Sequence, residues 1–213
     1  MSASTEIVLH GTELSGHCHR VELLLRMLGL PYRYVLAPGS VRSSAEFRKL
    51  NPLGQIPVLE DGSLILADSN AILVYLAKRY ARGGEWLPEE PAGAARVQRW
   101  LSIAAGEVMY GPAIARMVCL WDFPGDLERA GRISARLLEF MNAHLQSRHF
   151  LAAEHCTIAD LACYSYVAHA PEGGIPLDAY AAVRGWLRHV EALPHFKPMP
   201  AAPMPPSRLP AAG

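Results

Sequence analysis

The sequence predicts an α/β unit of the order βαβ–ββα, followed by an all-helical unit. Short runs of β-forming residues alternate with two helical patterns up to residue 80, and only helical spacing is found after residue 92. The stretch ARGGEWLPEEPAGA between them combines glycine, proline and acidic residues, as linkers do. We therefore expect four segments: an α/β domain over 1–80, a linker over 81–92, a helical domain over 93–197 and a Pro/Ala-rich tail over 198–213.

The first half of the α/β unit reads as strand, helix and strand. An apolar run at 7–9 predicts a buried strand, and apolar residues then recur at helical spacing from 21 to 28. Gly29-Leu30-Pro31 ends that helix, because glycine takes the left-handed position and proline cannot continue. The β-forming residues at 32–36 follow, so the helix is expected to cross between two parallel strands.

The second half of this unit reads as a hairpin and a helix. Strand patterns at 56–60 and 63–66 flank Asp61-Gly62, a dipeptide preferred in two-residue hairpin turns. From Ser69 onward the apolar residues again follow a helical period. We therefore expect an antiparallel pair to join the parallel one in a single sheet.

Helical periodicity dominates the second unit. The stretch 100–118 predicts its first long helix, and Thr157-Ile158-Ala159-Asp160 has the form of a capping box that starts another. Two further helices are indicated by apolar residues at helical spacing: Ile133, Leu137, Phe140, Met141 and Leu145, and then Val183, Trp186, Leu187 and Val190.

Composition excludes several classes of protein. Of 213 residues, 51% are hydrophobic and 19% charged, which suits a compact protein with a sizeable core. Lys+Arg and Asp+Glu are both 20, so no basic surface for nucleic acid or an anionic membrane is expected. The N-terminus lacks a signal-peptide pattern, and we expect no window of about 18 uncharged apolar residues for a spanning helix. These points predict a cytoplasmic protein.

The cysteine pattern predicts free thiols and no metal site. The four cysteines form no CxxC pair and no zinc-like spacing. His17, Cys18 and His19 are adjacent on a predicted helix, where consecutive side chains point about 100° apart and cannot converge on one ion. The cysteines are Cys18, Cys119, Cys156 and Cys163.

Four motifs carry a family resemblance. LSGHCHRVELLLRMLGLPY, NPLGQIPVLEDG, LADSNAILVYLA and TIADLACYSY occur in this order, and the chain up to about His195 resembles the soluble, serine-type bacterial glutathione transferases. The resemblance implies a thioredoxin-like domain that binds glutathione as cosubstrate, without a metal. It also implies a helical domain that forms most of a hydrophobic substrate site, and a homodimer.

Ser15 is the principal catalytic candidate. From the sequence alone it is a helix N-cap, a position at which serine contributes roughly 1 kcal/mol. The same place favours an anion, because free amides and the positive end of the helix dipole are there. A free thiol titrates near pH 8.5, so a hydroxyl donated to the sulfur would favour the thiolate. The resemblance implies this role for Ser15.

Cys18 and His17 are further candidates in the same motif. Ser15 and Cys18 form SxxC where glutaredoxin-like proteins have CxxC, and a two-cysteine redox cycle is excluded because it needs two sulfurs. Cys18 is a secondary catalytic candidate, or a packed thiol. His17 is expected to bind glutathione at the cleft, or to face solvent.

The resemblance also assigns the glutathione contacts. Gln55 would meet the glycyl carboxylate, without the charge of the lysine often found there, and the Ile56 backbone would pair with the cysteinyl unit. Pro57 would be cis, although by itself it could simply mark a strand start. Asp68 and Ser69 would hold the γ-glutamyl ammonium and carboxylate, or would be only helix caps.

Tyr110 and Arg116, on the predicted helix over 100–118, are candidates for the substrate site. The alternative is that Tyr110 packs between helices and that Arg116 lies on the surface.

The expected reaction joins the glutathione thiolate to a hydrophobic electrophile, and reduction of organic hydroperoxides is compatible with it. The alternatives are a glutathione-dependent isomerase of the maleylacetoacetate or maleylpyruvate type, and a non-enzymatic binding protein of the stringent-starvation type. Ser15, Pro57 and Ser69 together argue against the latter.

Overall fold

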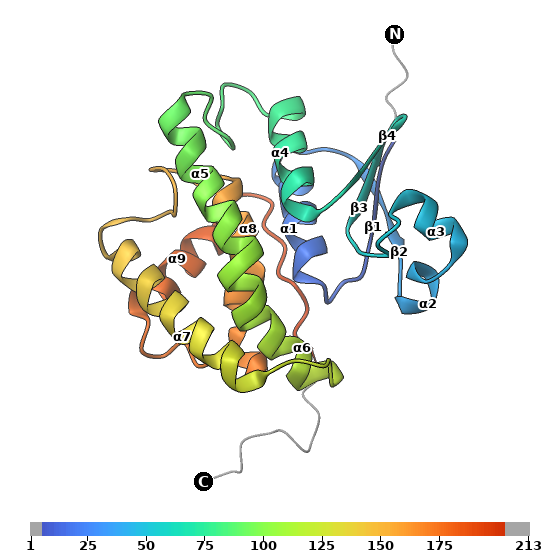
Figure 1. Cartoon of the computed structure of the whole chain (residues 1–213). Coiled ribbons are helices and arrows are strands. Elements are labelled where there is room, and N and C mark those ends of the chain that lie inside the picture. The colour runs from blue at the N-terminus through green and yellow to red at the C-terminus, as the bar shows by residue number, and fades with distance from the viewer. Residues whose placement is uncertain (1–5, 203–213) are drawn as a thin grey trace.

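The computed structural model describes residues 6–202, and its N-terminal part is built on a four-stranded sheet (Figure 1). The strand order is β2-β1-β3-β4, with β1 parallel to β2 and antiparallel to β3, and with β3 antiparallel to β4. This confirms the predicted α/β unit. The strands are β1 Ile7–Gly11, β2 Tyr32–Leu36, β3 Val58–Asp61 and β4 Leu64–Ala67.

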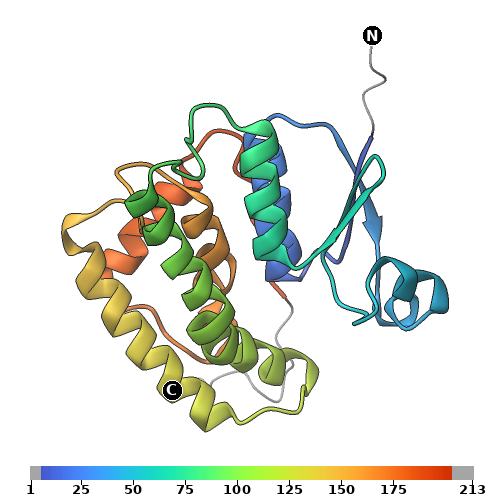
Figure 2. The same ribbon diagram turned by 45° about the horizontal axis from the view of Figure 1, so that its top comes forward.

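Helices cover both faces of the sheet. Helices α1 Gly16–Met27 and α4 Ser69–Tyr80 pack together between the sheet and the helical part of the molecule (Figure 2). Two short helices, α2 Gly39–Arg42 and α3 Ala45–Leu50, lie on the other side. The sequence pattern did not predict this second pair, because Phe47 is the only residue of the two helices that is buried.

The predicted end of α1 is confirmed in detail. Gly29 has φ +65°, in the left-handed region that glycine adopts without strain. Its N–H donates to the Arg26 carbonyl at 2.9 Å, and the Leu30 N–H donates to the Leu25 carbonyl at 2.9 Å. These bonds close the last turn and direct the chain into β2.

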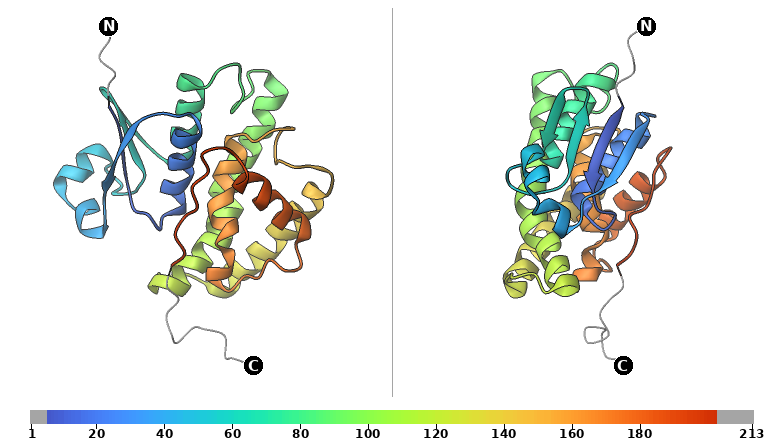
Figure 3. Two further views of the ribbon diagram at one scale, coloured as in Figure 1. Left: turned by 180° about the vertical axis from the view of Figure 1, so that it is seen from behind. Right: turned by 90° about the vertical axis from the view of Figure 1, so that its right-hand side faces the viewer.

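The C-terminal part is helical, as predicted, and α8 lies at its centre. Helix α8 packs on α1 of the sheet domain and on α5 (Figure 3). The elements of the C-terminal part are α5 Pro91–Ile103, the π-helical stretch η1 Ala104–Ala113, α6 Ile114–Trp121, α7 Leu127–His144, the 3₁₀ turn η2 Leu145–Ser147, α8 Ile158–Ala168, the 3₁₀ turn η3 Ala170–Gly173 and α9 Ala181–Glu191. Helix α5 thus begins at Pro91, near the end of the expected linker.

The long helix predicted over 100–118 changes its hydrogen-bond pattern on the way. Wide π turns occupy η1, and Pro112 inside η1 has no N–H to donate. By length and composition Pro91–Trp121 is apolar enough to cross a membrane, although charged residues such as Glu107 and Arg116 leave it no stretch of 18 uncharged residues. The apolar 18-residue stretch of this helix is 44% buried, and the helix packs on α7 and α8, as the core helix of a globular protein does.

The chain after α9 returns along α1 and α8. His19, in α1, lies within hydrogen-bond distance of the Lys197 carbonyl at 2.7 Å through Nε2 and of the Ser165 hydroxyl at 2.9 Å through Nδ1. Lys197 also donates to Glu22 at 2.8 Å. This segment therefore joins the two halves of the molecule. Residues 203–213 of the predicted tail lie outside the described residues.

Candidate active site at the start of α1

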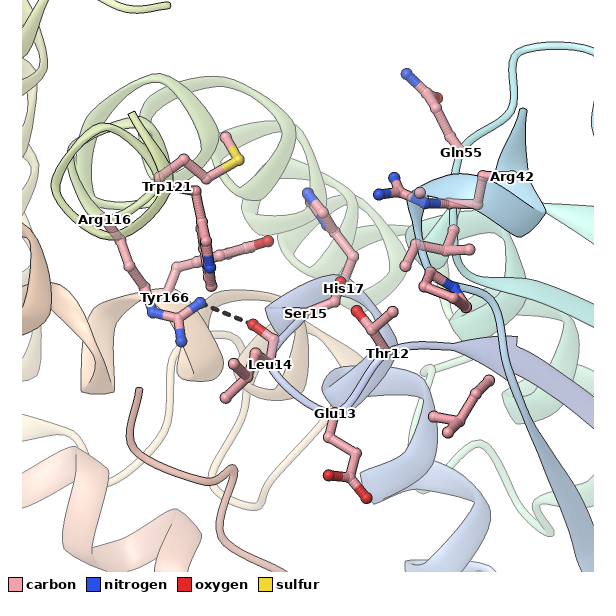
Figure 4. A pocket seen from close by; sticks show the side chains of 15 residues that line it. Thr12, Glu13, Leu14, Ser15, His17, Arg42, Gln55, Arg116, Trp121 and Tyr166 are labelled. Atoms are coloured by element: carbon pink, nitrogen blue, oxygen red, sulfur yellow. Dashed lines mark hydrogen bonds between the residues drawn. The ribbon is translucent and has the colours of Figure 1, made fainter. Parts of the chain in front are cut away.

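A cavity of about 580 Å³ lies between the sheet domain and the helical domain (Figure 4). One wall comes from the β1–α1 loop, the start of α1, the region of α2 and the loop before β3. The other wall comes from α6 and α8. We call it the interdomain cavity. Of the predicted site residues, it brings together Ser15, His17, Gln55, Ile56 and Arg116.

Ser15 is both the N-cap of α1 and a lining residue of the interdomain cavity. Its half-buried hydroxyl accepts from the Cys18 N–H at 3.3 Å. A serine hydroxyl has one hydrogen to donate and a second lone pair, so capping leaves its donor capacity unused. The first turn of α1 contains no acidic residue, so nothing there offsets the positive helix end.

The three side chains after Gly16 point to different partners. His17 lies 3.3 Å from the Ser69 hydroxyl through Nδ1, and its ring meets Tyr166 edge-to-face at 5.0 Å. Burial, aided by the charge of Arg20, lowers the pKa of His17 to about 3, so this ring is neutral at neutral pH. His19 instead contacts Ser165 and Lys197, as described above. The three side chains do not converge.

Cys18 lies in the core, with no exposed surface. Its thiol is close to the Tyr34 hydroxyl, and burial raises the pKa of Cys18. A protonated thiol outside the cavity lining cannot attack a substrate in this geometry. The structure therefore favours the packed thiol among the two readings of Cys18. Within residues 6–202 no three His, Cys, Asp or Glu side chains gather as a metal site would need.

The wall near the sheet holds Gln55, Ile56 and a residue that the sequence pattern missed. The Ile56–Pro57 peptide bond is cis. Pro57 is buried behind the wall. Arg42, from α2, lines the same cavity, and its Nε is buried without a partner within the described chain. Arg42 places in this wall a positive charge that Gln55 does not carry. In the sequence, the only indication of Arg42 was that a basic residue stands in the polar stretch after the second strand.

Asp68 and Ser69 start α4 but are not among the residues that line the interdomain cavity. Asp68 is the N-cap, with φ +72°, and its carboxylate accepts from the Asn70 and Ala71 N–H groups at 2.9 Å each. Ser69 is 4% exposed and accepts from Arg20 Nη1 at 3.4 Å. Ser69 is linked to the cavity through His17.

On the helical side, the structure separates the two predicted substrate residues. Tyr110 is 60% exposed and is not among the residues that line the interdomain cavity, and a substrate contact of Tyr110 stays a prediction. Arg116 lines the cavity but is 1% exposed, so the alternative of a surface arginine is wrong. Its guanidinium donates to Glu172 at 2.6 Å through Nε and to the Leu14 carbonyl at 2.8 Å through Nη1 (Figure 4).

Met117, Trp121 and Tyr166 complete the helical wall and were missed at the sequence level. Trp121 is 48% exposed, and the guanidinium carbon of Arg116 lies 5.1 Å from its ring centroid. Met117 and Trp121 are four residues apart on α6, which places them on one face. In the sequence, only an apolar pair at this spacing could have indicated these cavity residues, and such a pair is equally typical of a helix face in the core.

Comparisons with known proteins agree with this geometry. A model of the glutathione S-transferase N-terminal domain matches residues 9–88, and one of the C-terminal domain matches residues 125–194. Glutathione S-transferase 3 of Zea mays is 30% identical, over 93% of this chain and 95% of that protein.

Solved structures show the same arrangement. The crystal structure of a glutathione S-transferase from Pseudomonas fluorescens Pf-5 superposes with a TM-score of 0.85 at 31% identity, covering 91% of this chain and 98% of that one. A glutathione transferase homologue from Drosophila mojavensis, solved with bound glutathione, gives a TM-score of 0.78 at 26% identity, covering 89% of each chain.

A thioredoxin-like sheet domain and a helical domain that share a cavity at the start of α1 define a two-domain transferase fold. The chain belongs to the glutathione S-transferase family and is a glutathione transferase.

Proposed function

We propose that this enzyme is of the serine type and joins the sulfur of glutathione to hydrophobic electrophiles in the interdomain cavity. The observation that carries the proposal is the Ser15 hydroxyl, which lines the cavity at the positive end of α1 and has its donor capacity unused by the cap. The proposal includes a cytoplasmic location and a homodimer, as is typical of the family.

In this proposal Ser15 donates its hydroxyl hydrogen to the glutathione sulfur and favours the thiolate. One unit of pKa lowering corresponds to about 1.36 kcal/mol, which is of the order of one charge-assisted hydrogen bond. His17 stays neutral and does not titrate beside the sulfur at neutral pH. Catalysis then comes from an ionised sulfur held next to its target, without a covalent enzyme intermediate.

The rest of glutathione is proposed to follow the cavity wall of the sheet domain. Arg42 and Gln55 meet the glycyl carboxylate, and the Ile56 backbone, next to Pro57, pairs with the cysteinyl unit. Ser69 and Asp68 take the γ-glutamyl end at the start of α4, where an anion is favoured. The Drosophila mojavensis homologue, which has a similar fold, was solved with bound glutathione, which supports glutathione as the ligand.

The electrophile is proposed to lie on the helical side of the cavity. Met117 and Trp121, from α6, give this side an apolar surface, and Figure 4 shows Trp121, with Leu14 of the β1–α1 loop near it, across the cavity from Arg42 and Gln55. Trp121 is half exposed, so its ring is available to a flat or aromatic substrate. An apolar wall that faces a nucleophilic sulfur suits hydrophobic electrophiles.

Ser15→Ala tests the proposal. The pKa of bound glutathione should rise by about one unit, and turnover with a generic aryl halide should fall roughly tenfold or more, while glutathione affinity stays within about twofold. The pKa is measured from the ultraviolet absorbance of the thiolate. Ser44→Ala is the matched control, because Ser44 also caps a helix, accepting from the Phe47 N–H at 3.2 Å, but does not line the cavity.

Three outcomes would contradict the proposal. No measurable binding at millimolar glutathione would exclude the glutathione-dependent reaction. An unchanged thiol pKa and rate in Ser15→Ala would leave Ser15 as a cap only. A change in Cys18→Ala that exceeds the change in Ser15→Ala would show that the sulfur chemistry belongs to Cys18.

A further inference from the structure

We propose that Arg116 is a positioning residue for Ser15, and that it acts across the domain boundary by holding the β1–α1 loop. The inference rests on the proposed role of Ser15 in stabilising the thiolate. It differs from the substrate contact expected from the sequence, because Arg116 would act through protein atoms.

Arg116 reaches the loop directly before Ser15. Its Nη1 donates to the Leu14 carbonyl at 2.8 Å. That carbonyl and the Ser15 N–H belong to one planar peptide unit, so fixing the carbonyl also fixes the orientation of the Ser15 backbone. The Ser15 N–H donates to the Thr12 carbonyl at 3.1 Å, which closes the loop from the other side. The Ser15 side chain therefore extends from a peptide unit that is held by two hydrogen bonds.

The guanidinium is itself anchored by a buried cluster. Glu172 accepts from Arg116 Nε at 2.6 Å, and its other carboxylate oxygen lies 2.8 Å from His169 Nδ1 and accepts from the Ala202 N–H at 3.2 Å. Burial acts to raise the pKa of Glu172, but the hydrogen bonds of His169 and Arg116 outweigh it and lower that pKa to about 2. Glu172 is therefore a carboxylate at any pH at which the enzyme works.

The backbone around Glu172 is fitted closely to α6. A Cβ on Gly173 would lie 2.6 Å from the Arg116 backbone nitrogen, so only glycine allows η3 to approach α6 this closely. This approach brings the Glu172 carboxylate beside the guanidinium. Arg116 thus joins η3 and the C-terminal segment to the β1–α1 loop.

Most of the Arg116 guanidinium is committed to protein contacts. Nε and Nη1 donate to protein acceptors and the Trp121 ring lies 5.1 Å from the guanidinium carbon, whereas Nη2 is buried without a hydrogen-bond partner in the described part of the chain. The side chain is 1% exposed, and its positive charge is paired with Glu172. The geometry therefore favours an effect on Ser15 over direct binding of the electrophile.

Arg116→Met tests the inference in two backgrounds. In an otherwise wild-type enzyme it should raise the pKa of bound glutathione by about one unit in the binary complex, which contains no electrophile, and lower kcat roughly tenfold. KM for the electrophile should stay within about twofold. In the Ser15→Ala background, Arg116→Met should add nothing further to the thiol pKa, because the residue through which it acts is absent.

Matched variants separate an effect on Ser15 from the general loss of a positive charge. Arg96→Met removes an exposed arginine paired with Glu90 at 3.1 Å and should leave the thiol pKa unchanged. Arg116→Lys keeps the charge but cannot reach both Glu172 and Leu14 with one ammonium, so an intermediate thiol pKa is expected. If Arg116→Met does not fold, as judged by circular dichroism and S-methylglutathione affinity, Arg116→Lys decides the question.

Several results would overturn the inference. An equal rise in thiol pKa with and without Ser15 would show that Arg116 acts independently of Ser15. A wild-type thiol pKa in the folded Arg116→Met or, failing that, in Arg116→Lys would also overturn it, and a raised KM for the electrophile would then indicate a substrate contact. If Ser15→Ala alone does not change the thiol pKa, the proposed function of Ser15 fails first.

Discussion

The helix starts of α1 and α8 use the same chemistry in different surroundings. Ser15 caps α1 with a half-buried hydroxyl that accepts one backbone N–H and lines a cavity. Thr157 caps α8 with no exposed surface, in a complete capping box with Asp160. Both are hydroxyl residues at helix N-termini, and sequence alone treats them alike.

Asp160 explains why the start of α8 is structural. Its buried carboxylate accepts from the Leu151 N–H at 2.8 Å, the Trp186 indole N–H at 2.9 Å, the Thr157 N–H at 2.9 Å and the Thr157 hydroxyl at 3.2 Å. The α1 start has no such acid, because Cys18 stands three residues after Ser15 where Asp160 stands three after Thr157. A cap whose hydroxyl is used internally holds the fold, and a cap with a donor facing a cavity is available for chemistry.

Asp160→Ala should give the largest effect on this comparison. It leaves the donors of Leu151, Thr157 and Trp186 buried without an acceptor, and we expect a loss of about 3–4 kcal/mol in the free energy of unfolding. Urea unfolding measures the loss. The thiol pKa of bound glutathione should stay unchanged in the folded fraction.

Asp160→Asn is the control for Asp160→Ala, because it keeps an acceptor oxygen and the side-chain size. It should lose less than Asp160→Ala does. Equal losses in the two variants would mean that one acceptor oxygen and the side-chain volume do not suffice, and that the stabilisation depends on both carboxylate oxygens or on their charge. A shifted thiol pKa in either variant would show that the two helix starts are coupled.

His17 should give an intermediate effect at the start of α1. Its pKa is lowered to about 3 in the folded state, so between pH 6.5 and pH 3 only the unfolded chain binds this proton. Stability therefore falls as the pH falls through this window, and the contribution from pH 7 to pH 5 is about 2 kcal/mol. Urea unfolding of the wild type and His17→Gln at both pH values measures it.

The remaining acid sensitivity in His17→Gln is assigned to other groups. His19 is one of them, because burial lowers its pKa to about 4. Identical pH dependence in the wild type and His17→Gln would show that His17 is protonated in the folded protein. That result would also remove the argument for a neutral ring beside the thiolate.

The smallest effect on stability should come from the cap at Ser15, compared with the cap at Thr157. Thr157→Ala is expected to cost about 2 kcal/mol, because its hydroxyl is buried with Asp160, and Ser15→Ala about 0.5–1 kcal/mol, because water can replace its half-buried bond. Thermal or urea unfolding of both variants gives the order. If Ser15→Ala costs more than Thr157→Ala, Ser15 is the more structural cap and the contrast is reversed.

Local patterns predicted the fold because they do not depend on distant contacts. The cap at Ser15, the glycine end at Gly29 and the capping box at Thr157 each follow from a few neighbouring residues, and each is present in the structure. Helices α2 and α3 were missed, because such short helices expose nearly all of their residues and present no apolar period.

The site was only partly predictable, because side-chain direction depends on packing. In η1 the π turns contain more residues than α turns, so faces assigned at α-helical spacing drift, and Tyr110 points outward. The partners of Arg116 are Leu14 and Glu172, which lie far from it in sequence, so no local pattern predicts these contacts. Arg42 was missed because a basic residue in a polar stretch is ordinary at a protein surface, and only the fold places it in the cavity wall.

The buried cysteines have a consequence for an enzyme that handles electrophiles. All four of its thiols, Cys18, Cys119, Cys156 and Cys163, are buried and free. Burial raises the pKa of Cys18, Cys156 and Cys163, so these sulfurs are both covered and protonated. An alkylating compound must open the fold before it reaches these thiols, whereas glutathione at its proposed site in the cavity would meet it directly. The fold thereby shields these cysteines from alkylation.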